Sequence, residues 1–398
     1  MFADKFLERN QFVQRINEPP HPDTGIIVVI PCFREPDILL TLQSLALCAI
    51  PDVYSEVIIL VNHSEAASDE VKDKNDATIQ EVGRWIQRTP VSGMKFYAVG
   101  PVELKKKWAG VGMARKAGMD EAISRFNFLN KPEGIVVSLD ADTLVEENYL
   151  VEIGKFFKNN PAHAGATIAF SHQRENLGSR QLHGITLYEK YMDYYRKAMG
   201  ITGYPYPMYT VGSAITVTAA AYVKRGGMNR RQAGEDFYFL QNLVQVGPVG
   251  EINSTAVHPS ARISTRVPFG TGMVMKKWMN DEDDISLTYN FQSFLDLKKF
   301  FDLVPHVFRI EEPEYLRLLK TLPVAVEAFL REDHFYAELT DLNQNCSSVH
   351  TFHNRFYHRF NAFRILKFLN FTHGKYYSKA NLEDQIQILG NYLKNQTK

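Results

Sequence analysis

Residues 134–142 read Gly-Ile-Val-Val-Ser-Leu-Asp-Ala-Asp, an apolar run that ends in the carboxylates of Asp140 and Asp142. A run this short and this apolar is typical of a strand buried on both faces of a sheet. Two carboxylates one residue apart at the end of such a strand repel each other, and one would have to take up a proton unless a cation lies between them. Mg²⁺ and Mn²⁺ prefer hard oxygen ligands and leave coordination sites for phosphate oxygens. The stretch therefore predicts a metal and diphosphate site, with a solvated turn as the simpler alternative.

The composition of the whole chain is that of an ordinary globular protein. It has 398 residues, of which 45% are hydrophobic and 23% charged, and its formal net charge is zero. The length suits two domains, or one large domain with an extension. A zero net charge argues against a nucleic-acid binder that depends on bulk electrostatics, so we expect no nucleic-acid partner.

The cysteines and the N-terminus indicate where the protein works. Cys32, Cys48 and Cys346 lie far apart without the spacing of a metal site, which favours a reducing compartment over a disulfide scaffold. The N-terminus lacks the basic-then-apolar layout of a signal peptide. No apolar run approaches the roughly 20 residues that a membrane-spanning helix needs. We expect a cytoplasmic protein without a transmembrane segment, with peripheral contact to the inner face of the membrane left open.

Short apolar runs alternate with amphipathic stretches from about residue 25 to residue 175. The expected strands are 26–31, 56–61, 95–99, 134–139 and 166–170, and the expected helices are 39–45, 68–86, 112–126 and 145–157. Alternating strands and helices imply an α/β fold, in which a mostly parallel, Rossmann-like sheet carries helices on both faces. Ligands of such sheets bind outside the carboxyl ends of the strands. The polar pairs at those ends are Arg34-Glu35, Asn62-His63 and Asp140/Asp142.

The rest of the chain changes character. Residues 187–209 are rich in tyrosine, with helical spacing in the first half and a stiff Tyr-Pro-Tyr-Pro loop at 204–207. From about residue 283 the pattern is helical and rich in phenylalanine. We predict an N-terminal segment at 1–24, an α/β domain at 25–279 with halves 25–175 and 176–279, and a helical C-terminal extension at 280–398. A basic, aromatic helix at 355–371 could lie on a membrane surface, although its phenylalanines would more simply be core.

Four motifs follow one another along this pattern. They are Val-Val-Ile-Pro-Cys-Phe-Arg-Glu at 28–35, Asp-Ala-Asp at 140–142, Gly-Ser-Ala at 212–214 with Gly-Gly-Met at 226–228, and Gly-Glu-Asp-Phe at 234–237. Their order and spacing resemble glycosyltransferase family 2, a large group with the GT-A fold, over residues 25–272. The resemblance implies a metal-dependent transfer of a sugar from a UDP- or GDP-sugar to a hydroxyl acceptor, which a glycan, glycolipid or small molecule could supply.

The resemblance also implies roles for single residues on the donor side. Pro31, Phe33 and Glu35 would line the pocket for the base and ribose. Asp140 would contact the ribose or the metal, and Asp142 would hold the metal that bridges the diphosphate. In this view residues 25–175 are the nucleotide-binding half of the domain.

Residues 176–279 would then be the acceptor and catalytic half. Gly212 and Ser213 would shape the sugar and acceptor site, where small residues let a ligand approach the backbone. Asp236 would be the general base that deprotonates the acceptor hydroxyl, with Glu235 supporting it or contacting the acceptor. The simpler alternative is that Asp236 only starts the helix that follows it.

The chain departs from the family pattern on the donor side. Asn62 and His63 stand where the family usually has a pair of aspartates, so Asn62 could accept a hydrogen bond from the base or ribose but brings no charge. Arg115, in Ala-Arg-Lys-Ala-Gly at 114–118, keeps a role near the base or phosphate, and Lys116 is an added cation. The glutamine-rich motif of processive polysaccharide synthases is missing, which argues against processive synthesis.

A further stretch, His258 to Gly272, suits the diphosphate. Arg262 and Arg266 lie four residues apart beside hydroxyls and glycines, as expected of a lid over phosphates, unless they are ordinary ion-pair partners. His258 could complete the metal shell, because imidazole accepts Mn²⁺, unless it is simply a satisfied surface or core residue.

Several hypotheses about the reaction remain at this point. The Glu235-Asp236 pair before a helix favours an inverting transfer with Asp236 as base. His258 motivates a retaining enzyme of the same fold, similar to the synthases that glycosylate glycerate or phosphoglycerate. A protein that binds sugar nucleotides or glycans without catalysis is a third hypothesis. A nucleotidyltransferase is a weaker one, because residues 31–34 do not form the glycine-rich basic loop that it would need.

Overall fold

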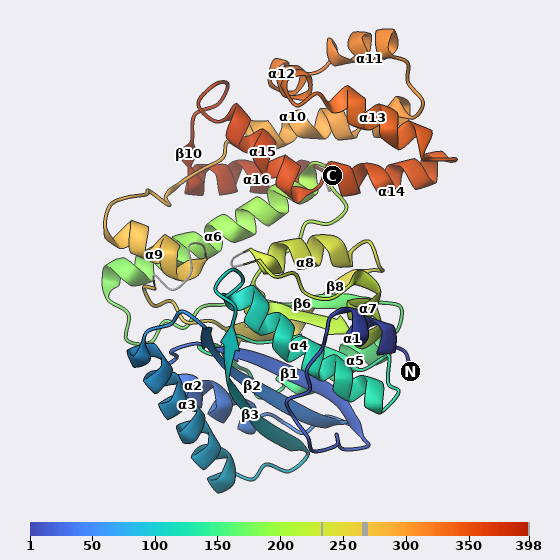
Figure 1. Cartoon of the computed structure of the whole chain (residues 1–398). Helices are drawn as coiled ribbons and strands as arrows, with labels where there is room; N and C mark the ends of the chain where they lie inside the picture. The colour runs from blue at the N-terminus through green and yellow to red at the C-terminus, as the bar shows by residue number, and fades with distance from the viewer. Residues whose placement is uncertain (232–233, 265–269, 397–398) are drawn as a thin grey trace. The chain divides into compact units, whose positions relative to one another are not determined.

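The computed structural model describes residues 1–231, 234–264 and 270–396 (Figure 1). The chain divides into two compact units. The first unit comprises Met1–Leu177 and Thr210–Lys276, and the second comprises Gly178–Tyr209 and Lys277–Lys398. Each unit is discontinuous in sequence, because the chain leaves the first unit after residue 177 and returns to it at residue 210.

One sheet forms the frame of the first unit. Its strands are β1 Thr24–Cys32, β2 Tyr54–Ser64, β3 Met94–Leu104, β4 Ile135–Ser138, β5 Leu144–Val145, β6 Gly165–Phe170, β7 Ile215–Thr218 and β8 Val249–His258. Within the described residues the sheet has eight strands in the order β3-β2-β1-β4-β7-β6-β8-β5. The strands β3, β2, β1 and β4 are mutually parallel, and β7 runs antiparallel to both β4 and β6.

Helices cover both faces of this sheet. The helices of the unit are α1 Asp4–Arg9, α2 Ile38–Ala46, α3 Asp69–Arg88, α4 Val111–Phe128, α5 Tyr149–Asn159, α7 Ala219–Arg225 and α8 Glu235–Leu243, followed by α9 Thr271–Met279 at the boundary between the units. Helix α4 packs across β1, β2 and β4. Its approach is close, since a Cβ atom on Gly118 would lie 2.4 Å from a methyl carbon of Val29.

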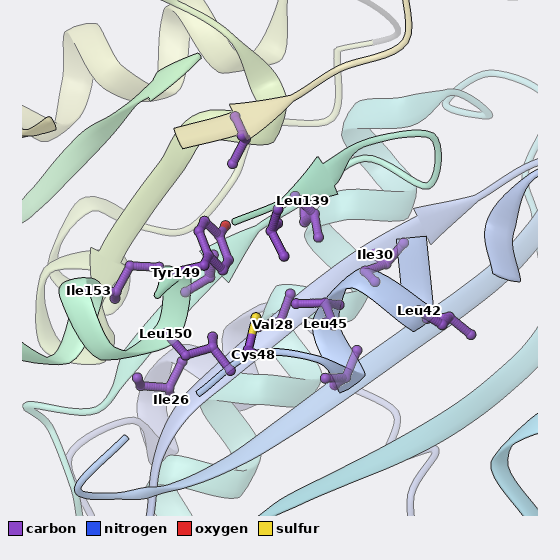
Figure 2. Close-up of a cluster of buried hydrophobic side chains, with 14 of the residues drawn as sticks. Ile26, Val28, Ile30, Leu42, Leu45, Cys48, Leu139, Tyr149, Leu150 and Ile153 are labelled. Atoms are coloured by element: carbon purple, nitrogen blue, oxygen red, sulfur yellow. The ribbon is translucent and has the colours of Figure 1, made fainter. Parts of the chain in front are cut away.

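The main hydrophobic core lies on the opposite face of the sheet (Figure 2). Alternate β1 residues Ile26, Val28 and Ile30 point into it, because successive side chains of a strand face opposite sides. They meet Leu42 and Leu45 of α2 in the same buried cluster. Full burial of each aliphatic side chain stabilises the fold by about 1.5–3 kcal/mol. The core therefore holds β1 and β4 firmly and fixes where their carboxyl ends lie.

The expected α/β class is confirmed, and each expected strand lies within or overlaps an observed one. In the first unit the sequence pattern missed three of the described strands: β5, β7 and β8. Strands β5 and β7 are very short, and β8 exposes several polar side chains, so none of the three shows a long continuous apolar run. The expected helix at 145–157 begins only at Tyr149, because Leu144 and Val145 pair with β8 instead.

The second unit is almost entirely helical. Its elements are α6 Ser179–Ile201, β9 Leu287–Thr288, α10 Phe291–Phe301, α11 Glu312–Leu319, α12 Val324–Glu332, α13 Phe335–Gln344, α14 Val349–Arg359, α15 Ala362–Thr372, β10 Ala380–Asn381 and α16 Leu382–Gln396. The expected helical C-terminal part is thus confirmed. Helix α6 belongs here because Tyr194 packs edge-on against Phe294, with ring centroids 6.0 Å apart. The predicted boundaries at 24, 175 and 279, which assign functions to segments, stay predictions.

The basic, aromatic stretch at 355–371 is not one helix. Asn361 separates α14 from α15, and its side chain accepts hydrogen bonds from the backbone N–H groups of Phe363 and Arg364. Phe356 and Phe368 are buried, and Arg364 pairs with Asp333 at 3.0 Å. Most of these aromatic side chains therefore lie in the core of the unit, whereas Phe363 is exposed. No helix in the described part of the chain combines the length and apolar character needed to cross a membrane.

Candidate functional site

The guanidinium of Arg115 joins two parts of the chain at the carboxyl edge of the sheet. Arg115 lies in the second turn of α4, and its side chain is only 2% exposed. One terminal nitrogen donates to Asp140, just after β4, and the other donates to Glu235, the first residue of α8. The ion pairs bring the Asp-Ala-Asp and Glu-Asp motifs, almost 100 positions apart, into one cluster.

Two glycines make this bridge possible. A Cβ atom on Gly212 would lie 2.7 Å from the Nη2 atom of Arg115, inside any real contact. A Cβ atom on Gly112 would lie 2.1 Å from the backbone oxygen of Arg231, where the start of α4 passes the segment before α8. Gly212 therefore leaves room for the guanidinium of Arg115, in addition to any role beside a sugar.

Asp236 lies next to this cluster in the first turn of α8. Its carboxylate accepts a hydrogen bond of 2.7 Å from the N–H of Phe237. Burial raises the pKa of Asp236, and the negative charge of Asp140 raises it further, whereas Arg115 and the Phe237 N–H act in the opposite direction. A carboxylate with a raised pKa is a better proton acceptor, as a general base requires.

Arg262 performs a similar bridging role on the other side of Asp140. It follows β8 and forms ion pairs with Glu35, with Asp142 at 2.9 Å and with Asp37 at 3.4 Å. Burial opposes the charge of this guanidinium, but hydrogen bonding to Glu35 and the charges of Asp142 and Asp37 leave its pKa above the ordinary arginine value. The structure thus brings together Glu35, Asp142 and Arg262, as the sequence expected of a single site.

These contacts bear on the repulsion between the carboxylates of Asp140 and Asp142, for which the sequence predicts a cation between them. In the structure each carboxylate has its own arginine, Arg115 for Asp140 and Arg262 for Asp142. Their charges are therefore offset by the protein itself.

Asn75 organises the ends of β1 and β2, and the sequence reasoning overlooked it. It is fully buried on α3, and its amide donates 2.8 Å to the backbone oxygen of Asn62. Its side-chain oxygen accepts from the N–H of Arg34, a residue held at φ 49°. A detectable signal existed, because Asn75 is a polar residue in the apolar stripe of α3 between Val71 and Val82.

The remaining donor-side candidates lie at the same edge. Pro31 is buried in β1 beside Leu60, and Phe33 is half-buried just after the strand. Asn62 is buried and donates 3.0 Å to the backbone oxygen of Cys32, so its amide is already used to tie β2 to β1. Ser213 is fully buried, and its hydroxyl has no hydrogen-bond partner among the described residues.

Three further candidates remain, namely His258, Arg266 and Lys116. His258 lies near Asp142, because the side-chain amide of Gln173 donates to the backbone oxygens of both residues, at 2.8 Å to Asp142 and 2.7 Å to His258. The Nδ1 atom of His258 lies 3.0 Å from both the hydroxyl and the backbone oxygen of Ser171, and its Nε2 atom lies 3.8 Å from Glu146. Both ring nitrogens of His258 therefore face protein groups. Arg266 falls outside the described residues. Lys116, expected to add a cation to the site, is instead buried and pairs with Asp120 at 2.7 Å.

The site fits a metal that takes few ligands from the protein. Within the described residues no three histidine, cysteine or acidic side chains converge as a ready-made metal site. The side chains of Asp140 and Asp142 are 35% and 24% exposed, so both carboxylates can be reached from solvent. Mg²⁺ is commonly bound by one or two carboxylates, with substrate phosphates and water completing its shell. Asp142, with Asp140 beside it, provides that donor set.

Comparisons with known proteins reach only distant likenesses. No protein-family model and no curated protein sequence matches the chain. Residues 1–349 of TarS from S. aureus, in complex with UDP-GlcNAc, are 14% identical, cover 83% of this chain and 89% of their own, and align with a TM-score of 0.41. The mannosyltransferase PcManGT from Pyrobaculum calidifontis, in complex with GDP-Man and Mn²⁺, is 13% identical, covers 77% and 70%, and has a TM-score of 0.38. Because these scores are low, we take the proposal below from the chain's own residues.

Proposed function

We propose that the protein is a GT-A glycosyltransferase that moves a sugar from a UDP- or GDP-sugar to a hydroxyl acceptor and inverts the anomeric configuration. Mg²⁺ or Mn²⁺ would be held by Asp142 with Asp140 beside it. Asp236 is the proposed general base, and Glu235 positions it. The resemblance to family 2 in the order of the motifs is the starting point of this proposal.

One observation carries the proposal. Arg115 joins Asp140, at the carboxyl end of β4, to Glu235, next to Asp236. A sugar transfer needs a charged donor site and a proton acceptor within reach of the same sugar carbon. The buried ion pairs supply that proximity, and the raised pKa of Asp236 suits the proton acceptor.

The residues divide the chemistry between them. The metal, when bound, would act as a Lewis acid that neutralises charge developing on the leaving diphosphate. Arg262 and Arg115 add positive charge on either side of that group. Asp236 takes the proton of the acceptor hydroxyl as the acceptor oxygen forms its bond to the anomeric carbon. The bond to the diphosphate oxygen breaks on the opposite side, and its electron pair leaves with the diphosphate.

The first experiment measures donor binding by thermal shift with UDP-, GDP-, dTDP- and CMP-sugars, with and without Mn²⁺. A donor at about a hundred times its Kd should add roughly 2.7 kcal/mol of stability. We expect a metal-dependent shift with one nucleotide class that disappears in Asp142→Asn. The exposed Asp73→Asn on α3 is the matched control and should keep the shift. The absence of any shift with wild-type protein would count against the function.

The second experiment tests the catalytic assignment. Asp236→Asn should keep donor binding and lose roughly two to four orders of magnitude in turnover, as expected for loss of a general base. Near-normal turnover of Asp236→Asn with donor and metal bound would disprove the inverting mechanism.

The alternatives are separated by product analysis. An NMR measurement of the product's anomeric configuration distinguishes inversion from retention, for which His258 was the motivation. Donor binding with neither transfer nor slow donor hydrolysis would indicate a binding protein without catalysis.

We also propose that the enzyme works in the cytoplasm, either free or peripherally bound to the inner face of the membrane. The cysteines support this location, since Cys32, Cys48 and Cys346 are all buried and no disulfide joins them within the described residues. Fractionation of cells, with the protein recovered in the cytosol or washed from membranes by salt, would test it.

A further inference from the structure

Arg262 contacts the carboxylate that the proposed function assigns to the metal. Its Nη2 atom lies 2.9 Å from the Oδ2 atom of Asp142, and its Nη1 atom lies 2.6 Å from the Oε1 atom of Glu35. The side chain of Glu35 is only 2% exposed, whereas that of Asp142 is 24% exposed. Arg262 therefore has a deeply buried partner and a more accessible one.

We propose that Arg262 is a built-in competitor of the divalent metal at Asp142, and that it leaves Asp142 for the diphosphate when the metal and the donor bind together. The inference rests on the proposed function, because it concerns the same metal and diphosphate. A guanidinium and a metal ion cannot share the Oδ2 atom of Asp142 without bringing two positive charges into contact. Binding of a metal through that atom thus costs the ion pair with Arg262.

Glu35 and Asp142, two of the three carboxylates that pair with Arg262, differ in how readily they can be given up. Loss of the pair with Glu35 would take a cation and its hydrogen bonds away from a buried carboxylate, which is strongly unfavourable. Loss of the pair with the more accessible Asp142 costs less, because solvent or a metal can replace the arginine. We therefore expect Arg262 to keep Glu35 and to exchange Asp142.

A diphosphate offers Arg262 a new partner. Phosphate oxygens accept two parallel hydrogen bonds from a guanidinium, as a carboxylate does. Arg262 lies in a segment after β8 without helix or strand hydrogen bonds, where its N–H donates 3.3 Å to the hydroxyl of Ser260. The consequence is cooperative binding, in which the metal binds weakly by itself and more tightly when a diphosphate is present.

The test measures Mn²⁺ binding directly, by the electron paramagnetic resonance signal of free Mn²⁺, so that no turnover is needed. In Arg262→Met, Mn²⁺ alone should bind about fivefold more tightly than in wild type, the factor that corresponds to a partly exposed ion pair. Inorganic pyrophosphate should tighten Mn²⁺ binding more in wild type than in Arg262→Met. Addition of Asp142→Asn to the variant should abolish the gain, which locates the ion at Asp142.

A matched control lies in the helical unit. Arg364 also pairs with two carboxylates, Asp333 and Glu338, and Arg364→Met should leave Mn²⁺ binding unchanged. Equal or weaker Mn²⁺ binding in Arg262→Met, or no saturable binding in either protein, would overturn the inference. If Arg262→Met folds poorly, the double variant with Glu35→Gln removes the buried negative charge that Arg262 offsets and is expected to show the same gain.

The result is separable from the outcome for the proposed function. A gain in Mn²⁺ affinity in Arg262→Met, together with failure of wild type to bind any UDP- or GDP-sugar, would support the competition and reject the donor assignment. Metal-dependent donor binding in wild type without a gain in Arg262→Met would reject the competition alone.

Discussion

At the scale of single residues, the site depends on buried charges that satisfy one another. Arg115 is buried together with Glu235, and truncation of one member of such a pair typically costs about 3–5 kcal/mol because the other charge is left unpaired. A variant of Arg115 would therefore report on folding as much as on function. The neighbouring glycine and the carboxylates around Asp236 allow more selective tests.

Gly212→Ala should disturb the bridge without removing a charge. The new Cβ atom would lie 2.7 Å from Nη2 and 3.2 Å from Cζ of Arg115, so the guanidinium must move away from its partners. We expect a loss of about 1–3 kcal/mol in the free energy of unfolding and a clear fall in kcat. Chemical denaturation and steady-state kinetics check both.

Gly83→Ala is the control for that substitution. Gly83 lies within α3, and a Cβ atom added to it would have no neighbour within 4 Å. Alanine there should be neutral or should stabilise the protein by up to about 1 kcal/mol, because glycine is a poor helix former. Equal behaviour of the two alanine variants would contradict the close contact at Arg115.

The pH dependence of the reaction should reflect Asp236. A general base works as the carboxylate, so kcat/KM must fall as the pH drops through its pKa. Burial raises that pKa above the ordinary aspartate value of 3.8, so the acid limb should lie at higher pH than for an ordinary aspartate. In Asp140→Asn, the residual activity should show this limb at lower pH, because a negative charge that raises the pKa is gone.

Asp142→Asn serves as the comparison in that experiment. It also lowers activity, but the main causes of the raised pKa of Asp236 are burial and, among nearby carboxylates, Asp140, so the acid limb should move less than in Asp140→Asn. Identical limbs in wild type and Asp140→Asn would contradict the assignment of Asp236 as the base.

At the scale of secondary structure, α3 holds the donor end of the sheet in shape through one side chain. Asn75 connects the loop after β1 to the end of β2 through the Arg34 N–H and the Asn62 carbonyl. It also lies 3.4 Å from the Nδ1 atom of His63. The helix thus contributes to the site without contributing a reactive group.

Asn75→Ala should weaken donor binding more than chemistry. The substitution takes the side-chain partner away from the part-buried N–H of Arg34 and the buried carbonyl of Asn62, and an unsatisfied buried group costs about 1–3 kcal/mol. We expect a lower melting temperature and a several-fold higher KM for the donor, with kcat nearly kept. The exposed neighbour Asp76→Ala is the control, and a pure kcat effect in Asn75→Ala would contradict a positioning role.

At the scale of the whole molecule, the second unit is built from two separate segments of the chain, and one of them interrupts the sequence of the first unit. Helix α6 lies in sequence between strands of the first unit, yet it packs against α10 and α16 of the second unit. The buried face of α6 includes Tyr194, Ala198 and Met199. The buried face of α6, in the segment Gly178–Tyr209, is therefore covered by helices of the second segment, Lys277–Lys398.

Truncation after Met279 should expose the face of α6. Each apolar side chain that loses its cover forfeits about 1.5–3 kcal/mol of burial. We expect the shortened chain to bind a hydrophobic dye and to be cut by chymotrypsin within residues 178–209. A chain that lacks only Thr397 and Lys398 is the control. A truncated chain with no dye binding and a protected α6 would show that the predicted boundary at 279 marks an independent domain.

The parts of the fold that the sequence predicted share one property: they depend on local pattern. The apolar run at 135–138 and the stretch of α4 after its glycine-rich turn show their character directly in the order of residues. The sequence pattern did not predict strand β7, because this strand has only four residues. Its stability comes from pairing with β4 and β6, which lie in distant parts of the chain. The sequence pattern also did not predict the break between α14 and α15 at Asn361, because the apolar periodicity continues across it.

The residue types at the site followed from the chain order, since carboxylates at strand ends and before a helix point to a charged ligand and a base. The partners of those residues did not. Which arginine faces Asp140, which one faces Asp142, and whether Lys116 joins them depend on side chains that meet across the sheet and its covering helices. In the unfolded chain a charged side chain interacts with water and has no preferred partner. Burial excludes that water, and the charge then needs a specific partner. Only the folded chain, by excluding that water, pairs Arg115 with Asp140, Arg262 with Asp142 and Lys116 with Asp120.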